Sequence, residues 1–418
     1  MMTESIIHLK DDNYYIEDVR LDQLCQSFGT PSYIYSKKSI VDSFNKLDKA
    51  FNNYERLICF AVKANPNIAI LNVLANLGAG FDIVSGGELK RVIAAKGDTK
   101  KVVFSGIGKS IDEISLALKH EILAFNVESE AELYRIQDIA KSMGKTANIS
   151  IRVNPDVDAK THPYISTGLK DNKFGVDEKK AIDLYKIAKD MDSIIIKGVD
   201  CHIGSQITEI GPFTDAITKL LKMIDTLTLM GIEIDHLDIG GGIGINYDDE
   251  KIFNFDEYAA AISRLFAKRK FKIIFEPGRA IVGKAGILLS KIEYIKKGQS
   301  KNFAVIDAAM NDLMRPSLYN AHHQIINTSN CNEKRDTYDI VGPVCETGDF
   351  LGKNRKLSIS PNNILAILDV GAYGMSMSSN YNSRTRPTEL LIDGNKVFEI
   401  KKREVFDDLI RYESLPSV

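Results

Sequence analysis

The chain has 418 residues, enough for two domains with substantial hydrophobic cores. Its 54 Lys and Arg residues nearly balance its 56 Asp and Glu residues, so the net charge of -2 favours neither nucleic acid nor an anionic membrane as a partner. The five scattered cysteines lack metal-ligand spacing, which predicts a reducing, cytoplasmic environment without a disulfide framework or a zinc site. We also expect no signal peptide and no membrane span, because no apolar stretch is long enough.

The first strongly predicted strand is the apolar run Leu57–Lys63, which places Lys63 at its carboxyl end before the terminating Asn65-Pro66. Apolar neighbours desolvate the Lys63 amine and disfavour its ammonium form, which favours a nucleophilic amine. Such an amine can form an imine with the carbonyl of a substrate or of pyridoxal phosphate (PLP). A solvated lysine at the end of a strand is the alternative.

Short β-rich runs and helical patterns alternate from residue 57 to residue 279. The predicted strands are Leu57–Lys63, Phe81–Ser85, Lys101–Gly106, Ile122–Glu128, Asn148–Val153, Ile194–His202, Ile234–Gly240 and Phe271–Glu276. The predicted helices are Glu88–Lys96, Ser110–His120, Ser129–Met143, Glu178–Asp190, Pro212–Met230 and Asp256–Lys268. Eight strands alternating with helices predict an α/β fold, a (β/α)8 barrel over residues 36–285. An open doubly wound sheet is the alternative, and the missing G-x-G-x-x-G after the first strand disfavours it.

The alternation of predicted strands and helices ends after residue 285. Further strands are predicted at Gly286–Lys296, Phe303–Ala309, Thr337–Gly342, Ile364–Leu368 and Glu389–Ile392, with turn residues between them. This pattern predicts a second, β-rich domain over residues 286–418. Two short β-like pieces in residues 1–35, Ile6–Lys10 and Ser32–Tyr35, are expected to join that domain.

Reactive or phosphate-suited residues stand at six of the eight predicted barrel strand ends. They are Lys63, Asp82 with Ser85-Gly86-Gly87-Glu88, Arg152 with Asn154, His202 with Ser205, Gly240–Gly244, and Glu276-Pro277-Gly278-Arg279. Active sites of (β/α)8 barrels lie at the carboxyl ends of the strands. The pattern therefore predicts an active site at this end of the barrel.

Two glycine-bearing turns follow the last two predicted barrel strands. In Gly240-Gly241-Gly242, successive backbone amides can approach an anion without interference from a Cβ, and Pro277-Gly278 forms a second tight turn. A lone triple glycine is more simply a bulge or a tight turn. Because both turns occur where barrels commonly bind phosphate, the pair favours a phosphate site.

Three other side chains gain a role if Lys63 holds PLP. His202 would stack on the flat ring, although an isolated histidine is more commonly a core residue. Glu276 would keep the pyridine nitrogen protonated, which makes the ring an electron sink; its alternative is a surface carboxylate. Arg152 would contact the phenolic oxygen side of the cofactor or pair with neighbouring carboxylates.

The predicted β-rich domain carries its own cluster of reactive residues. Arg315 and Tyr319 place a cation and a phenol four residues apart, and Cys345 and Glu346 lie in a glycine-flanked turn. Tyr373 lies between small residues in a turn, where we expect it to be exposed. For Cys345, an inert small hydrophobe is the alternative interpretation.

Stretches over nearly the whole chain resemble the PLP-dependent decarboxylases of the alanine-racemase-like fold, and among them the diaminopimelate decarboxylases. They are FAVKAN, FDIVSGGEL, THPYISTGLKDNKFG, HIGSQI, DIGGGIGI, EPGR, MRPSLYNAHH, VGPVCETGDFL and GAYGMSMSSNYNSRTRP, in the order of the family. The resemblance implies decarboxylation of meso-2,6-diaminopimelate to L-lysine and carbon dioxide, the last step of lysine biosynthesis.

The resemblance also implies roles for individual residues. PLP would be bound by Lys63, Asp82, Arg152, His202, Ser205, Gly241, Gly242, Glu276, Gly278, Arg279 and Tyr373. The amino-acid substrate would be bound by Arg279, Arg315, Tyr319, Glu346 and Tyr373. No metal is expected. Lys63 and Cys345 would be the catalytic residues: the substrate amine displaces Lys63 from the imine, carbon dioxide leaves, and Cys345 supplies the proton to Cα.

The family's active site is similar in lying at a homodimer interface, so Cys345 and Glu346 would act on the cofactor of the other subunit. The insertion Thr161–Gly175 resembles the family's substrate-covering loop. The competing functions are a related decarboxylase acting on ornithine, arginine or carboxynorspermidine, an alanine-racemase-like enzyme, a PLP carrier without turnover, and a cofactor-free sugar-phosphate enzyme. Paired arginines disfavour the first, Glu276 the second, and the β-rich domain the last two.

Overall fold

The structure is a computed structural model that describes residues 6–158, 173–248, 251–266, 269 and 271–416. Contacts divide the chain into two compact units. We call Ser43–Asn246 with Glu250–Ile281 the barrel unit, and Met1–Asp42 with Tyr247–Asp249 and Val282–Val418 the β-rich unit.

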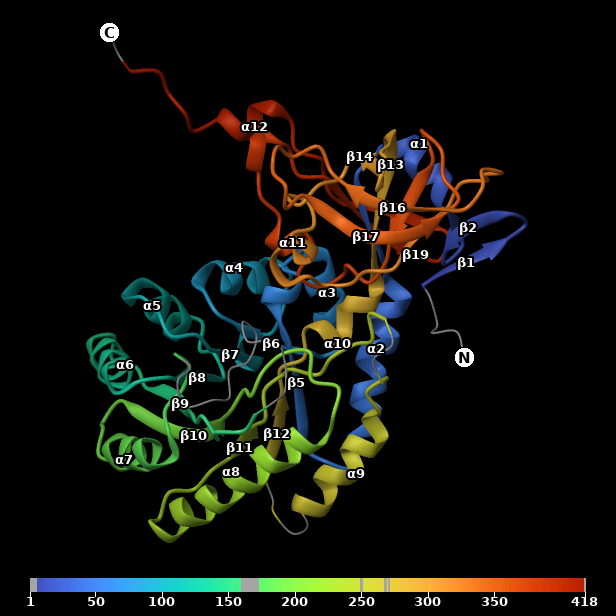
Figure 1. Cartoon of the computed structure of the whole chain (residues 1–418). Helices are drawn as coiled ribbons and strands as arrows, with labels where there is room; N and C mark the ends of the chain where they lie inside the picture. Colours follow the sequence, from blue (N-terminus) through green and yellow to red (C-terminus); the bar gives the residue numbers. More distant parts are fainter. Residues whose placement is uncertain (1–5, 159–172, 249–250, 267–268, 270, 417–418) are drawn as a thin grey trace. The chain divides into compact units, whose positions relative to one another are not determined.

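Eight parallel strands close the barrel in the order β10-β11-β12-β5-β6-β7-β8-β9 (Figure 1). The strands are β5 (Arg56–Ala61), β6 (Gly80–Ile83), β7 (Val102–Phe104), β8 (Ala124–Val127), β9 (Ala147–Arg152), β10 (Ile194–Asp200), β11 (His236–Asp238) and β12 (Lys272–Phe275). The last strand pairs with the first, since Ile274 of β12 lies opposite Leu57 of β5. The predicted fold class, a barrel with a separate β-rich part, is confirmed.

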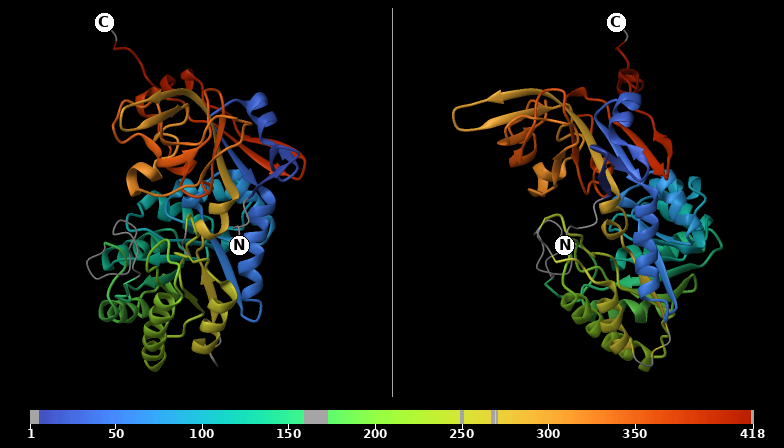
Figure 2. Two further views of the ribbon diagram at one scale, coloured as in Figure 1. Left: turned by 45° about the vertical axis from the view of Figure 1, so that its right-hand side comes forward. Right: turned by 90° about the vertical axis from the view of Figure 1, so that its right-hand side faces the viewer.

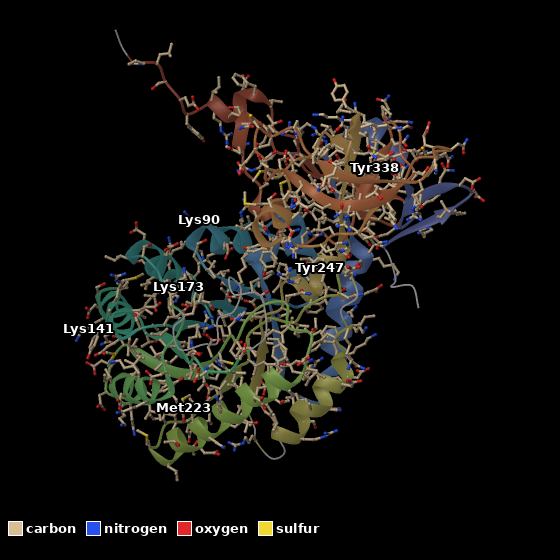
Figure 3. All side chains as sticks on the ribbon, viewed as in Figure 1. Lys90, Lys141, Lys173, Met223, Tyr247 and Tyr338 are labelled. Atoms are coloured by element: carbon tan, nitrogen blue, oxygen red, sulfur yellow. The ribbon has the colours of Figure 1, made fainter. Side chains whose placement is uncertain are left out.

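Helices cover the outside of these strands (Figures 1 and 2). They are α3 (Ile68–Asn76), α4 (Gly86–Ala94), α5 (Ile111–Lys119), α6 (Glu130–Ser142), α7 (Glu178–Lys189), α8 (Gly211–Leu229) and α9 (Phe255–Phe266), preceded in the chain by α2 (Lys37–Ala50). Several begin at a side chain that accepts a hydrogen bond from a free backbone amide, as Ser110 does in the capping box of α5. Buried apolar side chains such as Met223 of α8 hold the helices in place (Figure 3).

The β-rich unit contains a nine-stranded sheet whose main path runs β17-β16-β14-β13-β4-β19-β20, with β18 on β13 and β15 on β18. The strands are β4 (Ser32–Ser36), β13 (Gly286–Lys297), β14 (Asn302–Ile306), β15 (Ile325–Asn327), β16 (Asp336–Val341), β17 (Phe350–Leu357), β18 (Ile364–Ile367), β19 (Thr388–Asp393) and β20 (Lys396–Lys401). Tyr338 of β16 is buried in this unit (Figure 3).

The N-terminal strand β4 lies inside this sheet, antiparallel to β13 and parallel to β19. All five of its residues are buried. The segment before it forms a small sheet of β1 (Ile7–Lys10), β2 (Asn13–Ile16) and β3 (Val19–Arg20), followed by α1 (Leu21–Phe28). The remaining helices are the short α10 (Arg279–Val282), α11 (Arg315–Tyr319) and α12 (Phe406–Ile410). Among the described residues, no helix is long and apolar enough to cross a membrane.

Candidate active site

Lys63 lies at the carboxyl end of the barrel strands, but the prediction that it ends a strand is wrong. Strand β5 stops at Ala61, and Lys63 occupies a single 3-10 turn, Val62–Ala64. The turn gives the side chain a new direction after the strand. The Lys63 Nζ lies 2.8 Å from Oδ2 of Asp82, whose side chain is fully buried at the end of β6. A buried carboxylate thus holds a partly exposed amine at the rim of the barrel.

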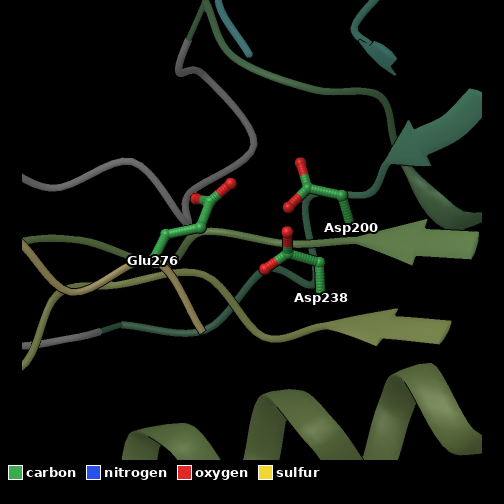
Figure 4. A group of neighbouring side chains, drawn as sticks. All are labelled: Asp200, Asp238 and Glu276. Atoms are coloured by element: carbon green, nitrogen blue, oxygen red, sulfur yellow. The ribbon is translucent and has the colours of Figure 1, made fainter. Parts of the chain in front are cut away.

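A group of acidic side chains fills the same end of the barrel. The carboxyl groups of Asp200, Asp238 and Glu276 are buried, and one oxygen from each lies within 4.8 Å of the others (Figure 4). Arg152 is the buried cation beside them, with Nη1 3.1 Å from Oε1 of Glu128 and Nε 3.9 Å from Oδ2 of Asp200. In these contacts Arg152 pairs with carboxylates, which was one of its two predicted roles.

The His202 ring is half-buried just beyond the end of β10, and its Nδ1 accepts a hydrogen bond from the backbone amide of Gly204. Desolvation, with the positive charges of Arg152 and Lys63 nearby, lowers the pKa of His202 well below its usual value. The ring is therefore neutral and keeps its proton on Nε2. A neutral, flat ring of this kind can stack on a flat cofactor without adding charge.

The glycines after β11 and β12 are required by close backbone packing. A Cβ on Gly241 would lie 2.1 Å from the carbonyl oxygen of Glu276, and a Cβ on Gly278 would lie 2.8 Å from the Cβ of Ala64. Gly242 has a φ of +92°, which an L side chain rarely adopts. No other residue type fits these turns without moving the backbone.

The same turns can hold a phosphate. Within the described part of the chain, no hydrogen bond is recorded from the backbone amides of Gly241, Gly242 and Gly278, and two of these residues are buried. Arg279 Nη2 donates to Oγ of Ser205 at 3.2 Å, which places a cation and a hydroxyl together. Buried amide donors beside an arginine suit a phosphate, so the barrel end fits the phosphate, ring and aldehyde of PLP.

In the β-rich unit, Arg315 is held in a preformed setting. Its guanidinium is buried, Nη1 lies 2.8 Å from Nε2 of His323, and its Cζ lies 4.5 Å from the ring centre of Tyr247. His323 in turn contacts the carbonyl of Leu368 through Nδ1 at 2.8 Å. Tyr319, which is predicted to bind the substrate together with Arg315, ends the short helix that Arg315 begins.

Cys345 and Glu346 lie in a turn of the β-rich unit, where the Cys345 side chain is exposed. The backbone amide of Cys345 donates to Oδ1 of Asn382 at 2.9 Å. A hydrogen bond to Glu346 raises the pKa of Tyr381, so this phenol stays protonated. Tyr373 is half-buried with a φ of +58°, so the prediction that it is exposed is wrong.

The barrel unit brings together most of the predicted PLP-binding residues, and the β-rich unit carries the remaining predicted residues. Those in the barrel unit are Lys63, Asp82, Arg152, His202, Ser205, Gly241, Gly242, Glu276, Gly278 and Arg279; those in the β-rich unit are Arg315, Tyr319, Cys345, Glu346 and Tyr373. Residues 161–172 of the predicted substrate-covering loop lie outside the described residues.

Sequence reasoning missed several side chains that surround the predicted ones. They are Glu128, Asp200, Asp238, Tyr247 and His323. Asp238 carried a signal, because it stands two residues before the glycine turn at the end of a strand, and Asp200 stands two residues before His202. Tyr247 and His323 carried none, since their contact with Arg315 depends on tertiary structure.

Comparisons with known proteins agree with this site. Residues 37–283 match the family model described as pyridoxal-dependent decarboxylase, pyridoxal binding domain. A diaminopimelate decarboxylase from Vibrio cholerae is 51% identical over 97% of this chain and 98% of its own length. The crystal structure of diaminopimelate decarboxylase from Helicobacter pylori, complexed with L-lysine, has a TM-score of 0.91 at 44% identity, covering 94% of this chain and 98% of that one.

A second solved structure, diaminopimelate decarboxylase from M. jannaschii in complex with L-lysine, has a TM-score of 0.94 at 41% identity, covering 99% of this chain and 98% of that one. The fold and the barrel site define a PLP-dependent carboxy-lyase. The chain belongs to the diaminopimelate decarboxylase family. The predicted family, enzyme class and PLP cofactor are confirmed.

Proposed function

We propose that this protein decarboxylates meso-2,6-diaminopimelate to L-lysine and carbon dioxide, with PLP attached at Lys63. The observation that carries the proposal is the Lys63–Asp82 pair beside the buried Glu276 at the carboxyl end of a barrel whose relatives decarboxylate diaminopimelate. When bound, PLP supplies an aldehyde that captures amines and a ring that accepts the electron pair left by departing carbon dioxide.

The chain's own residues prepare this chemistry. Asp82 fixes the position of the Lys63 amine, and the neutral ring of His202 offers a flat surface for the cofactor. The amides of Gly241, Gly242 and Gly278, with Ser205 and Arg279, hold the phosphate. Glu276 would accept a hydrogen bond from the protonated ring nitrogen, Arg152 keeps the surrounding carboxylates in place, and Tyr373 would contact the phosphate and the substrate.

Substrate recognition follows from the charges at the far end of diaminopimelate. That end is itself an amino acid, so it needs cations for its carboxylate and an anion for its ammonium. We assign Arg279, Arg315 and Tyr319 to the carboxylate and Glu346 to the ammonium. Arg315 suits this task because His323 and the Tyr247 ring hold its guanidinium in one orientation before substrate arrives.

We further propose a homodimer that shares its active sites, with Cys345 and Glu346 of the partner subunit completing each one. Cys345 Sγ would deliver the proton to the carbon that has lost carbon dioxide. The exposure of Cys345 supports this, because an exposed thiol can reach another chain. The five free cysteines also support a reducing, cytoplasmic location.

Mixing two inactive variants tests the shared site. Lys63→Ala lacks the amine and Cys345→Ala lacks the proton donor, but a heterodimer of the two contains one complete site. We expect a 1:1 mixture to recover about a quarter of wild-type turnover after subunit exchange, because half of the dimers carry one intact site out of two. The measurement is carbon dioxide release, with exchange followed by native mass spectrometry. Confirmed exchange without recovered turnover would show that each site is built from one chain.

The substrate itself is tested by measuring carbon dioxide release from meso-diaminopimelate in the presence of PLP, beside ornithine, arginine and lysine. We expect release from diaminopimelate alone, with L-lysine as the product, because the other substrates lack the distal amino-acid group that Arg315 is positioned to bind. Release from ornithine or arginine at a comparable rate would keep the fold and cofactor but overturn the assignment of Arg279, Arg315 and Glu346.

A further inference from the structure

Glu128 is a buried glutamate at the carboxyl end of the barrel, and the function proposed above gives it no task of its own. It directly follows β8, and its side chain is 1% exposed. Beside it lies Arg152, which ends the neighbouring strand β9 and which the family resemblance assigns to PLP (Figure 1). Arg152 Nη1 lies 3.1 Å from Oε1 of Glu128. A carboxylate without an assigned task thus holds a residue assigned to the cofactor.

Both oxygens of the Glu128 carboxylate accept hydrogen bonds. Besides the guanidinium of Arg152, Oε1 accepts the backbone amide of Gly106 at 2.8 Å, and Oε2 accepts the backbone amide of Gly175 at 3.0 Å. Gly106 lies in the segment after β7, and Gly175 lies shortly before α7. One carboxylate therefore joins three segments of the barrel end. Two backbone amides on different oxygens fix its orientation, so the place of the third donor, the guanidinium, is fixed as well.

A second buried ion pair holds the backbone from which Glu128 extends. Lys109 Nζ lies 2.6 Å from Oε1 of Glu132, and these side chains are 1% and 7% exposed. The other oxygen of Glu132 accepts the backbone amide of Glu128 at 2.7 Å. Lys109 also donates to the carbonyl oxygens of Gly106 and Asn126, both at 2.8 Å. Because breaking a buried ion pair is strongly destabilising, this pair anchors the base of Glu128 while the three donors anchor its tip.

Arg152 has a competing carboxylate nearby. Its Nε lies 3.9 Å from Oδ2 of Asp200, which is buried and accepts no hydrogen bond from the described residues. Without Glu128, the guanidinium would move toward Asp200, because a buried carboxylate without a donor strongly attracts a cation. The ring of Phe174 lies 5.0 Å from Cζ of Arg152 and attracts the charge without fixing its hydrogen bonds. Glu128 therefore decides where the guanidinium of Arg152 lies.

We propose that Glu128 is a positioning residue of the cofactor site: it holds the guanidinium of Arg152 toward PLP and away from Asp200, and it acts on PLP through Arg152. The inference rests on the function proposed above, because it takes PLP as the ligand of the barrel end and Arg152 as one of its contacts. It adds a requirement for the length of a glutamate, since a shorter carboxylate cannot reach Gly106, Arg152 and Gly175 together.

Glu128→Asp tests the position of the carboxylate without changing its charge, because it shortens the side chain by one C–C bond, about 1.5 Å. We expect the apparent dissociation constant of PLP to rise by about 10-fold, the order expected for loss of one charge-assisted hydrogen bond. The measurement is visible absorption while PLP is titrated into cofactor-free protein. Glu130→Asp is the matched control, because Glu130 begins α6 with a side chain that is 41% exposed, and its affinity should equal that of wild type.

A double-mutant cycle separates positioning from a general loss of structure. Arg152→Met removes the guanidinium at similar length and is expected to raise the apparent dissociation constant of PLP by about 10-fold or more. If Glu128 acts through Arg152, adding Glu128→Asp to Arg152→Met should change this constant by less than about 2-fold. Effects that multiply, an unchanged affinity in Glu128→Asp, or an Arg152→Met protein that binds PLP like wild type would each overturn the proposal.

Hydrogen–deuterium exchange of the cofactor-free protein gives a readout that needs no PLP. The amides of Gly106 and Gly175 should exchange slowly in wild type and in Glu130→Asp, and at least about 10-fold faster in Glu128→Asp. Equal rates in Glu128→Asp and wild type would show that this carboxylate does not hold the two segments. If Glu128→Asp does not fold, the wild type alone decides, since fast exchange of both amides there contradicts the proposal.

The proposed substrate and this inference can fail separately. If the cycle and the exchange rates are as expected but no carbon dioxide is released from diaminopimelate, the proposed substrate is wrong and the role of Glu128 stands. If the protein decarboxylates diaminopimelate while the effects of Glu128→Asp and Arg152→Met multiply, the proposed function stands and the role of Glu128 is wrong.

Discussion

Replacing Lys63 by alanine is expected to remove the covalent attachment of PLP and to lower turnover of diaminopimelate by at least about 10³-fold. The reason is that Lys63 supplies the amine at the barrel end, held by its 2.8 Å contact with Asp82. The measurement is the visible absorption of the PLP-bound protein, followed by borohydride reduction and peptide mapping to locate the attached group.

Lys90→Ala is the matched control, because Lys90 is an exposed lysine on α4 of the same unit (Figure 3). It should keep the absorption, the attachment and the turnover of the wild type. An unchanged spectrum in Lys63→Ala would mean that another lysine holds PLP. Removing Lys63 also leaves the buried Asp82 without its cation, so the melting temperature should be recorded beside the spectrum.

Replacing Arg315 by alanine is expected to lower kcat/KM for diaminopimelate by about 30-fold or more, because truncating one partner of a buried, charged contact has an effect of at least about 2 kcal/mol. The loss should appear chiefly in KM, since Arg315 is assigned to the distal carboxylate and not to the reacting carbon. Steady-state kinetics with diaminopimelate checks both quantities.

The affinity for PLP distinguishes a substrate residue from a structural one. All contacts of Arg315 given above lie within the β-rich unit, so PLP should bind to Arg315→Ala as it does to wild type. Arg315→Lys keeps the charge but loses the planar fork, so it should recover only part of kcat/KM. If Arg315→Ala loses PLP, the assignment of Arg315 to the substrate alone is wrong.

Much of the fold could be predicted because the barrel strands are short apolar runs between amphipathic helices. The misses have physical causes. Helix α3 is apolar along most of its length, so it lacks helical periodicity. Strand β17 contains Gly352 followed by Lys353 and Asn354, which resembles a turn, and only pairing with β16 makes it a strand.

The candidate site was predictable where a reactive residue stands within two residues of the end of a strand, as Asp82, His202 and Glu276 do. The site was not predictable where a side chain supports a site residue from another part of the sequence. His323 supports Arg315 from the next segment, and Tyr247 reaches the same arginine from 68 residues earlier in the chain. Such contacts have no sequence pattern, because the folded chain alone brings the residues together.

The place of β4 within its sheet affects how the protein is made on the ribosome. Both neighbours of β4, β13 and β19, come from the carboxyl-terminal part of the chain. Roughly 350 residues separate β4 from β19, so at cellular rates of synthesis β4 waits roughly 20 to 70 s for its last neighbour. All of the barrel strands are made before β13, so throughout their synthesis Tyr33, Ile34 and Tyr35 are an unpaired apolar strand in the nascent chain. This segment is therefore where we expect chaperones to bind during translation, and where aggregation would begin without them.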